Sequence, residues 1–416
     1  MYQLFSGNYD RSFCPVSFTI PKAQLPGESV AVQLEDGKKI PAAISVRGDE
    51  ATVTFVLDYL LKGEEIKFDL ISEGERSGVI NADLTESSVE ITKGDYFVTR
   101  YYFGKDLAKP YMGPFKEKYG KQVTRLNFEI KEHPHHRSLW FSHGAVNGVD
   151  TWNEPAGKHG FILNNSIEGL ESNGVYCEFT ANNTWTDFNK SPLCDDVTKI
   201  RIYSTPEQLL IIDTDLTLSA NYGDVTLGKT KEAGPIAVRM NDELVVGRTG
   251  KFVTPTGVNE DEIWMKRAPW CDYCGVAEGH SCGITIMDNP ENEGYPTYWH
   301  ARNYGLMAPN NSFIPEEKVI KNGESANWKF RVMVHNGDTE SARVADHYAN
   351  YIAMPLVVNR EEDGRKVIWP VDPERAVIPF KLPEDLTGWP EIPKWKKDMP
   401  AFMKWVREND KLPKRG

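Results

Sequence analysis

The chain lacks any apolar run of about 18 residues, the shortest length expected of a helix that crosses a membrane. Its N-terminus has neither a basic start nor an apolar stretch of the kind that signal peptides carry. We therefore expect a cytoplasmic protein, or a periplasmic one if a signal was trimmed. Basic residues number 48 against 60 acidic ones, the net charge is −12, and there is no basic stripe. These absences predict no membrane span and no nucleic-acid partner.

Several sequence signatures of catalysis are missing as well. There is no GxSxG elbow, no Walker loop, no Rossmann fingerprint after a strand and no HExxH, which disfavours nucleotide-dependent and serine-hydrolase mechanisms. The 416 residues include only six cysteines, and their scatter argues against a disulfide framework. Cys271 and Cys274 form one CxxC pair, which favours ordinary packing over a zinc site.

The sequence is rich in β-strand patterning. Short apolar segments alternate with turn residues near the N-terminus, and longer strand-like segments follow, as at 30–34, 51–57, 175–180, 209–218 and 328–335. We predict a mainly β protein in which residues 1–95 form a small N-terminal β-sandwich. Residues 96–338 are expected to form a large antiparallel sandwich that is the catalytic domain.

Residues 339–416 differ from the rest of the chain. The segment 341–351 predicts a helix with Ala342, Ala345, Tyr348 and Ala349 on its apolar face. A segment rich in proline and tryptophan follows and is expected to wrap the surface, with one more short helix at 399–409.

The densest cluster of reactive side chains lies between His133 and Gly144, where four of the nine histidines fall. Histidine titrates near neutrality, so it can transfer a proton or bind a metal. Pro134 cannot donate a ladder hydrogen bond, so we expect a loop or strand edge there, followed by a strand at 139–141. The alternative interpretation is a set of surface histidines bonded to backbone carbonyls.

Two further segments supply candidate groups. The first, at 147–160, contributes Asn147, Glu154 and His159, which could equally belong to a surface turn. In the second, at 298–310, strand alternation would place Tyr298, His300 and Arg302 on one face, with Trp299 and Ala301 on the other. Arginine suits the bidentate binding of a carboxylate. Arg239 lies within an apolar strand and needs a partner there.

These segments resemble a family of bacterial proteins known as PmoA-like. The shared patterns cover residues 133–144, 146–152 and 299–305, within a similarity that spans roughly 95–340. The resemblance implies a carbohydrate-metabolism protein with a β-supersandwich in the style of galactose mutarotases. The family name refers to methane oxygenation, but a membrane monooxygenase subunit needs spanning helices, so we do not expect a methane oxygenase.

The favoured hypothesis is a carbohydrate-active enzyme that cleaves or rearranges a glycoside or uronic acid by β-elimination. In it, a base removes a proton beside a carbonyl or carboxylate, cations stabilise the enolate and an acid protonates the leaving oxygen. The base is His136 or His143, and the acid is His300 or Tyr298. Arg137 and Arg302 stabilise the negative charge.

Three alternatives stay open. A metal-assisted glycoside hydrolase would use a divalent ion held by His133, His135 and either His143 or Glu154. A mutarotase-like epimerase would need a histidine base and a carboxylate. A non-catalytic sugar-binding module would stack pyranose rings on Trp140, Trp152 and Trp299. Residues Asn147, His159 and Arg239 are further candidate substrate-binding groups.

The expected partner is a small-molecule or oligosaccharide substrate, and a homodimer is a further option for a chain of this size. No cofactor is required by the elimination hypothesis, and the divalent metal ion belongs to the hydrolase alternative alone. All these hypotheses need distant segments of the chain to meet around one site.

Overall fold

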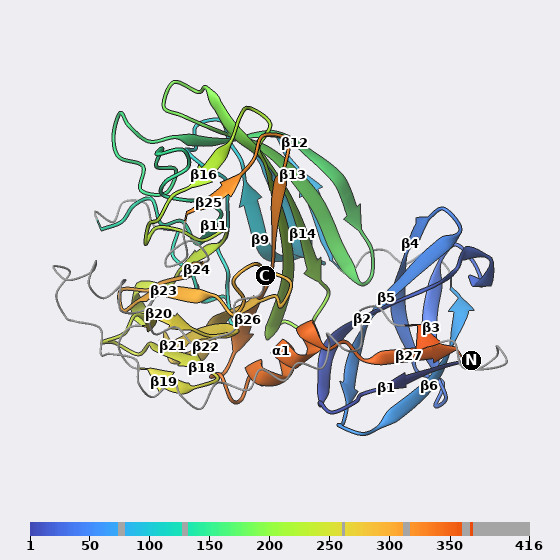
Figure 1. The fold of residues 1–416 in the computed structure, drawn as a ribbon. Helices are drawn as coiled ribbons and strands as arrows, with labels where there is room; N and C mark the ends of the chain where they lie inside the picture. Colours follow the sequence, from blue (N-terminus) through green and yellow to red (C-terminus); the bar gives the residue numbers. More distant parts are fainter. Residues whose placement is uncertain (74–79, 127–131, 260–262, 311–316, 360–366, 369–416) are drawn as a thin grey trace.

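The computed structural model describes residues 1–73, 80–126, 132–259, 263–310, 317–359 and 367–368 (Figure 1). Within these residues the chain consists mostly of antiparallel strands in three large sheets and one small ribbon, which confirms the predicted mainly β class. In Figure 1 the N-terminal sheet forms one body beside a larger one, and α1 (Val344–Ile352) lies between them.

The N-terminal sheet has the strand order β2-β5-β4-β3-β6-β1-β27-β28. Its strands are β1 (Tyr2–Phe5), β2 (Arg11–Pro21), β3 (Val30–Leu34), β4 (Lys39–Arg47), β5 (Glu50–Leu60), β6 (Glu65–Ser72), β27 (Leu356–Asn359) and β28 (Val367–Ile368). The outermost strands β2 and β28 approach each other, so the sheet curls around one apolar core. Phe18, Phe55 and Phe68 pack edge to face in that core.

The larger body contains two nine-stranded sheets. The first, called the site sheet below, has the order β20-β23-β24-β17-β11-β10-β9-β8-β7. Its strands are β7 (Asn81–Leu84), β8 (Ser88–Lys93), β9 (Tyr96–Tyr102), β10 (Tyr111–Met112), β11 (Leu139–Trp140), β17 (Ala237–Arg239), β20 (Ile263–Arg267), β23 (Tyr298–Arg302) and β24 (Leu306–Asn310).

The second, called the opposite sheet, has the order β12-β13-β14-β15-β26-β22-β21-β18-β19. Its strands are β12 (Phe161–Ser172), β13 (Tyr176–Thr186), β14 (Pro192–Tyr203), β15 (Leu209–Ser219), β18 (Lys251–Thr254), β19 (Gly257–Asn259), β21 (Trp270–Ala277), β22 (His280–Asp288) and β26 (Ser325–Asn336). A two-stranded ribbon joins β16 (Val225–Leu227) to β25 (Lys318–Ile320).

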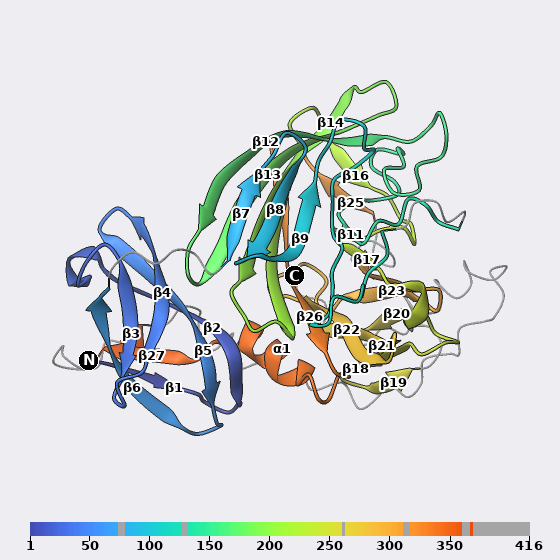
Figure 2. The same ribbon diagram turned by 180° about the vertical axis from the view of Figure 1, so that it is seen from behind.

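The two nine-stranded sheets pack face to face around the main apolar core (Figure 2). Alternation along each strand decides which side chains enter that core. In β26, Phe330, Val332 and Val334 point into it, whereas Met333 points outward to a second cluster. The predicted large antiparallel sandwich is therefore present.

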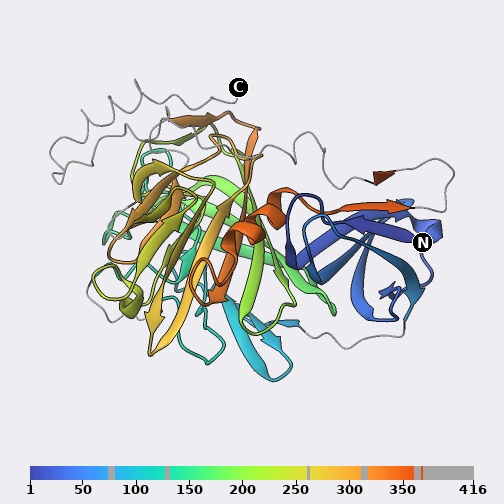
Figure 3. The same cartoon turned by 90° about the horizontal axis from the view of Figure 1, so that it is seen from below.

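Helix α1 packs in the space between the two bodies (Figure 3). Val344 and Tyr348 lie in one apolar cluster with Met333 of the opposite sheet and Ala43 of the N-terminal sheet. The helix was predicted at 341–351, but its expected face is rotated, because Ala345 is exposed. Tertiary packing sets the buried face of the helix, because both the N-terminal sheet and the opposite sheet contact it.

Strand pairing also differs from the predicted division of the chain. Strands β7 and β8 precede residue 95 but belong to the site sheet, where β7 pairs with β8 and β8 pairs with β9. Strand β27 follows residue 338 but pairs with β1 of the N-terminal sheet. Such long-range pairing cannot be seen in local periodicity. The expected helix at 399–409 and most of the segment rich in proline and tryptophan lie outside the described residues.

In the part of the chain that the structure describes, no helix is both long enough and apolar enough to span a bilayer.

Candidate functional site

The candidate site lies on the outer face of the site sheet, away from the main core. In β11, Leu139 enters the main core while Trp140 points outward, and in β17 Val238 enters it while Ala237 points outward. The outward residues form a separate aromatic cluster with Trp152. Loops before β11 and after it cover this cluster, so motifs distant in the sequence meet there.

Glu132 anchors the histidine-rich loop to the site sheet. Its carboxylate accepts from both terminal nitrogens of Arg239, at 2.6 and 3.4 Å, and from Arg125 at 3.1 Å. It also contacts the ring of His133. Burial opposes ionisation, but hydrogen bonds and charge from Arg239, with His133 and Arg125, outweigh it and lower the Glu132 pKa to about 2. The loop is therefore fixed by ionic hydrogen bonds.

His136 is held between two groups that can only donate. The guanidinium of Arg239 lies 3.1 Å from Nδ1 and the indole nitrogen of Trp152 lies 3.3 Å from Nε2. A neutral imidazole accepts at only one nitrogen, so one of these two contacts is a hydrogen bond, and protonation of the ring would remove that acceptor. Burial, followed by the neighbouring His135 and Arg239, holds the pKa of His136 well below its usual value. His136 is thus kept neutral and confined.

A set of nearly parallel rings connects the buried cluster to the surface. The ring of His136 stacks on Trp140 at 5.1 Å and on His133 at 4.9 Å, and His133 stacks on Tyr304 at 4.7 Å. Trp140 is fully buried, whereas His133 and Tyr304 are partly exposed. Tyr304 also lies beneath the guanidinium of Arg239, at 4.8 Å. The accessible rings of the site are therefore His133 and Tyr304.

Lys109, Arg137 and Glu154 form a buried ion cluster beside the rings. Arg137 binds both carboxylate oxygens of Glu154, at 2.5 and 2.8 Å, and Lys109 donates to the same carboxylate at 2.5 Å. Lys109 also donates to the carbonyl of Trp152 at 2.9 Å. Its side chain is only 1% exposed, and this burial lowers the Lys109 pKa to about 8. One carboxylate is shared by two cations.

His135 is a second partly exposed imidazole of the site, after His133. It packs edge-on against His136 at 4.4 Å and against His133 at 5.8 Å. Burial, together with Lys109, lowers its pKa to about 4, so the ring is neutral at neutral pH. Its Nε2 is buried and has no hydrogen-bond partner among the described residues. The ring as a whole is partly exposed, and a neutral imidazole can accept a proton.

Strand β23 brings the third sequence segment to the same face. Alternation is as predicted, because Trp299 and Ala301 enter the main core, whereas the ring of His300 packs 6.5 Å from Trp152. The guanidinium of Arg302 lies 4.0 Å from the ring of Trp264 and 5.8 Å from that of Tyr304. Tyr298 lies beneath Arg267, at 5.1 Å. Imidazoles of the first segment and guanidinium of the last therefore converge.

Two candidate acids on this strand are poorly accessible. His300 is 4% exposed, and burial lowers its pKa to about 3, so it holds no extra proton at neutral pH. Tyr298 is 6% exposed. Tyr304 is more accessible, and burial raises its pKa to about 12 despite Arg302 and Arg239 nearby. Its hydroxyl is therefore protonated at neutral pH.

The predicted sugar platforms are not available. Trp140 and Trp152 have no exposed surface, and Trp299 is 1% exposed, with its indole donating to the carbonyl of Ala268 at 2.9 Å. Large aromatic side chains stabilise a protein by burying much apolar surface. These three tryptophans do this on the two faces of the site sheet. The expectation that they stack on pyranose rings is wrong for this conformation.

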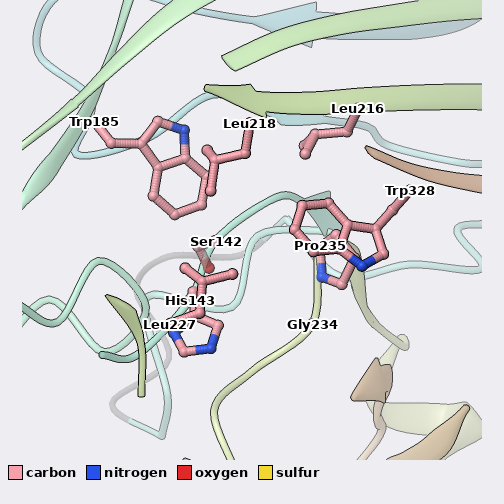
Figure 4. Close-up of a pocket in the computed structure, with 9 residues that line it drawn as sticks. All are labelled: Ser142, His143, Trp185, Leu216, Leu218, Leu227, Gly234, Pro235 and Trp328. Carbon is pink, nitrogen blue, oxygen red and sulfur yellow. The ribbon is translucent and has the colours of Figure 1, made fainter. Parts of the chain in front are cut away.

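Other predicted residues lie apart from the ring set. The ring of His143 faces a cavity between the two sheets, lined by Trp185 and Leu216 of the opposite sheet (Figure 4). The amide of Asn147 bonds to the backbone of Thr226 and Asp224. His159 packs on Phe161 and Phe188. None of these contacts involves the described rings of the site.

The predicted metal ligands His133, His135 and Glu154 do not assemble. Among the described residues, no three side chains of His, Cys, Asp or Glu are grouped closely enough to hold a metal ion. The carboxylate of Glu154 is engaged by Arg137 and Lys109. The cysteines Cys271 and Cys274 are buried and free, in keeping with ordinary packing.

Several residues of the site were missed by sequence reasoning. These are Lys109, Arg125, Glu132, Trp264 and Tyr304. Glu132 directly precedes the histidine cluster, and Tyr304 lies inside the third segment, so proximity could have suggested both. Lys109 stands between Ala108 and Pro110 with no local signal, because its partners are more than 40 residues away.

Fold and site together define a β-sandwich protein with a cluster of imidazoles, guanidinium groups and aromatic rings on the outer face of one sheet. The chain belongs to the family of unknown function DUF6807, whose model matches residues 88–349. That range contains every described residue of the ring set and of the ion cluster.

Comparison with other proteins adds little beyond the family. No sequence among the curated proteins matches the chain. A solved structure of a GalM/aldose epimerase homologue from C. elegans is similar with a TM-score of 0.27 and 7% identity, over 63% of this chain and 99% of that chain. A likeness at this level carries no argument, so function has to be argued from the site itself.

Proposed function

We propose that the protein is a carbohydrate-active enzyme that acts on an acidic or keto sugar by proton transfer, with β-elimination as the reaction. The observation that carries the proposal is the convergence at one partly exposed rim. A neutral imidazole, His135, and a protonated phenol, Tyr304, both contact the ring of His133 there, and the guanidinium of Arg302 lies next to the phenol. Base, acid and cation are the three groups that such an elimination needs.

In this proposal His135 is the base. Its imidazole takes the proton from the carbon next to the carboxylate or carbonyl, and the electron pair of that C–H bond becomes a new carbon–carbon double bond. The C–O bond to the leaving group breaks at the same time. The leaving oxygen takes the proton of Tyr304, and water returns the proton of His135 to the tyrosine. One sugar thus gives an unsaturated sugar and an alcohol.

A cation stabilises the developing negative charge. Arg302 is the group that would bind the carboxylate or the enolate-like oxygen, since a guanidinium binds such oxygens in a bidentate manner. Arg137 does not take this role, because both of its terminal nitrogens bind the carboxylate of Glu154. His136 keeps a positioning role, because Arg239 and Trp152 occupy both of its nitrogens. Elimination is favoured over the epimerase alternative because Glu132 and Glu154 are each bound by two cations and are poor bases.

The test is an assay of the purified full chain on uronides and 3-keto-glycosides, read as ultraviolet absorbance of the unsaturated product. We expect His135→Ala and Tyr304→Phe each to reduce turnover by roughly 10²-fold or more, the usual contribution of a positioned acid or base. His280→Ala is the matched control, because that ring stacks on the exposed Tyr119.

Two results would refute the elimination mechanism. One is the absence of any unsaturated product across the panel. The other is full activity in His135→Ala. Optical rotation change on free aldoses without absorbance would instead favour the epimerase.

A further inference from the structure

A group of aromatic rings that the proposed mechanism does not use lies where β12 begins. His159 packs on Phe161 with ring centroids 4.6 Å apart, and Phe188, from the turn between β13 and β14, lies 6.4 Å from Phe161 with an angle of 27° between the rings. Phe188 is 46% exposed and is the only exposed phenylalanine among the described residues. His159 and Phe161 are partly exposed. These three residues are called the aromatic patch below.

The aromatic patch lies next to the candidate site. The amide of Ile162, in β12, donates to the carbonyl of Ala108 at 2.8 Å. The next residue along the chain is Lys109 of the ion cluster, and burial together with the charge of Lys109 lowers the pKa of His135 to about 4. The loop that carries Glu154, the carboxylate of the same cluster, leads directly into the patch. The patch and the proposed base therefore flank one ion cluster.

The turn that carries Phe188 is fixed by its own hydrogen bonds. The amide of Lys190 donates to the carbonyl of Asp187 at 3.1 Å, and the amide of Ser191 donates to Oδ1 of Asp187 at 2.8 Å. Lys190 has a left-handed backbone with a φ of 66°, a conformation that favours glycine. It is exposed, and its ammonium lies 5.5 Å from the ring centroid of Phe161. An exposed ring and a cation are therefore presented together before any ligand binds.

His159 adds a nitrogen that can accept a hydrogen bond. Its Nδ1 lies 2.8 Å from the carbonyl oxygen of Gly160. A carbonyl oxygen only accepts, so Nδ1 carries a proton, and Nε2 of the neutral ring is then an acceptor. The patch thus combines an apolar ring face, an acceptor and the cation of Lys190, which are groups that one acidic sugar unit can engage together.

We propose that the aromatic patch is a second subsite, which binds one pyranose unit of an acidic oligosaccharide whose other units extend to the candidate site. The apolar C–H face of the sugar packs on Phe188, a hydroxyl donates to Nε2 of His159, and the ammonium of Lys190 donates to the carboxylate. This inference rests on the proposed function, because it specifies the substrate of the same site as a uronic-acid oligomer.

The charges around the patch support an acidic ligand. Lys158 and Lys190 are both exposed. The carboxylates of Asp150 and Asp187 accept hydrogen bonds from backbone amides within their own turns. The whole chain has a net charge of −12, so two exposed lysines at one aromatic patch are a local exception that favours an anion there.

The test measures the binding of galacturonic acid and of its linear tetramer by calorimetry. The full chain is used with the His135→Ala substitution, so that the proposed base is absent and the ligand is not consumed. We expect the tetramer to bind at least tenfold more tightly than the monomer, because only the tetramer reaches both subsites.

Variants of the patch identify the groups responsible. Phe188→Ala should weaken tetramer binding by roughly five- to tenfold, the effect of losing one aromatic contact. Phe188→Leu keeps apolar packing in the turn and should weaken binding as well, because the flat ring is absent. Lys190→Gly relieves the left-handed backbone and should weaken binding of the tetramer several-fold, but not that of its methyl ester. Tyr119→Ala is the matched control, since Tyr119 is also an exposed ring stacked on a histidine.

Two results would overturn the proposal. In one, the tetramer does not bind, or binds no more tightly than the monomer. In the other, both Phe188 variants keep the original affinity for the tetramer. The ultraviolet assay judges elimination separately. Unsaturated product together with unchanged binding in the Phe188 variants removes the second subsite alone, whereas binding that depends on Phe188 without any product removes elimination alone.

Discussion

Glu154→Ala is expected to lower the free energy of unfolding by about 3 kcal/mol, the usual cost of removing one partner of a buried ion pair. Glu154 is the carboxylate shared by Arg137 and Lys109, and Lys109 is only 1% exposed. Its removal leaves two cations with much of their hydration gone. Urea unfolding of the full chain at pH 7.5 measures the change.

Two further variants separate charge from packing. Lys109→Met in the Glu154→Ala background should recover part of the lost stability, because the most deeply buried cation is then absent. Glu154→Gln should have an intermediate effect, since the amide oxygen still accepts from Arg137. A change below about 1 kcal/mol in Glu154→Ala would mean that the cluster contributes no more than an exposed salt bridge does.

Acidification from pH 6.5 to pH 5 is expected to destabilise the fold strongly. Five histidines are responsible: burial lowers the pKa values of His135 and His143 to about 4 and those of His300 and His347 to about 3, and that of His136 lies well below its usual value. Below pH 6.5 the unfolded chain binds up to five protons at these side chains that the folded chain does not bind. Stability is therefore complete above pH 6.5 and falls as the pH decreases.

Two buried carboxyl groups oppose this trend. Burial raises the pKa of Asp288 to about 7 and that of Asp196 to about 6, so the folded chain binds these two protons first. Subtracting two protons from five leaves a net uptake of three on unfolding. The expected slope is then roughly 4 kcal/mol per pH unit between pH 6 and pH 5.

Guanidinium unfolding at pH 7.5, 6.5, 5.5 and 5 measures this slope. His347→Phe provides the control, because it removes one of the five histidines, at a distance from the candidate site, and should make the slope shallower. A free energy of unfolding that stays constant from pH 7.5 to pH 5 would show that the buried rings take up protons as readily as free histidine.

Local pattern was sufficient for much of the fold. Alternation along 30–34, 209–218 and 328–335 identified strands β3, β15 and β26, since a half-buried strand must place apolar side chains on one side. The same rule placed His300 and Arg302 on the face opposite Trp299. Pattern could not reveal that β7 and β8 join the site sheet or that β27 joins β1, because strand partners far apart in sequence leave no local trace.

The site was predictable only in part for the same reason. The density of imidazoles from His133 to His143 pointed to a loop of the candidate site, but not to the partners of each ring. His136 and His143 are equivalent in sequence, yet one is held by Arg239 and Trp152 and the other faces a pocket between the sheets. The tryptophans that were expected at a sugar cleft are buried. The sequence could not show this, because a tryptophan in a strand has the same local pattern whether its indole packs in a core or lines a cleft.

The sequence by itself determined the β class, the alternation of faces along each strand and the segments that supply reactive side chains. These properties follow from residues within a few positions of one another. Only the tertiary structure decided which imidazole keeps a free nitrogen, which carboxylate is bound by Lys109, and which side of the sheet His143 occupies. Burial and the placement of charges depend on contacts across the whole chain, and they set both the pKa values and the accessibility of each group.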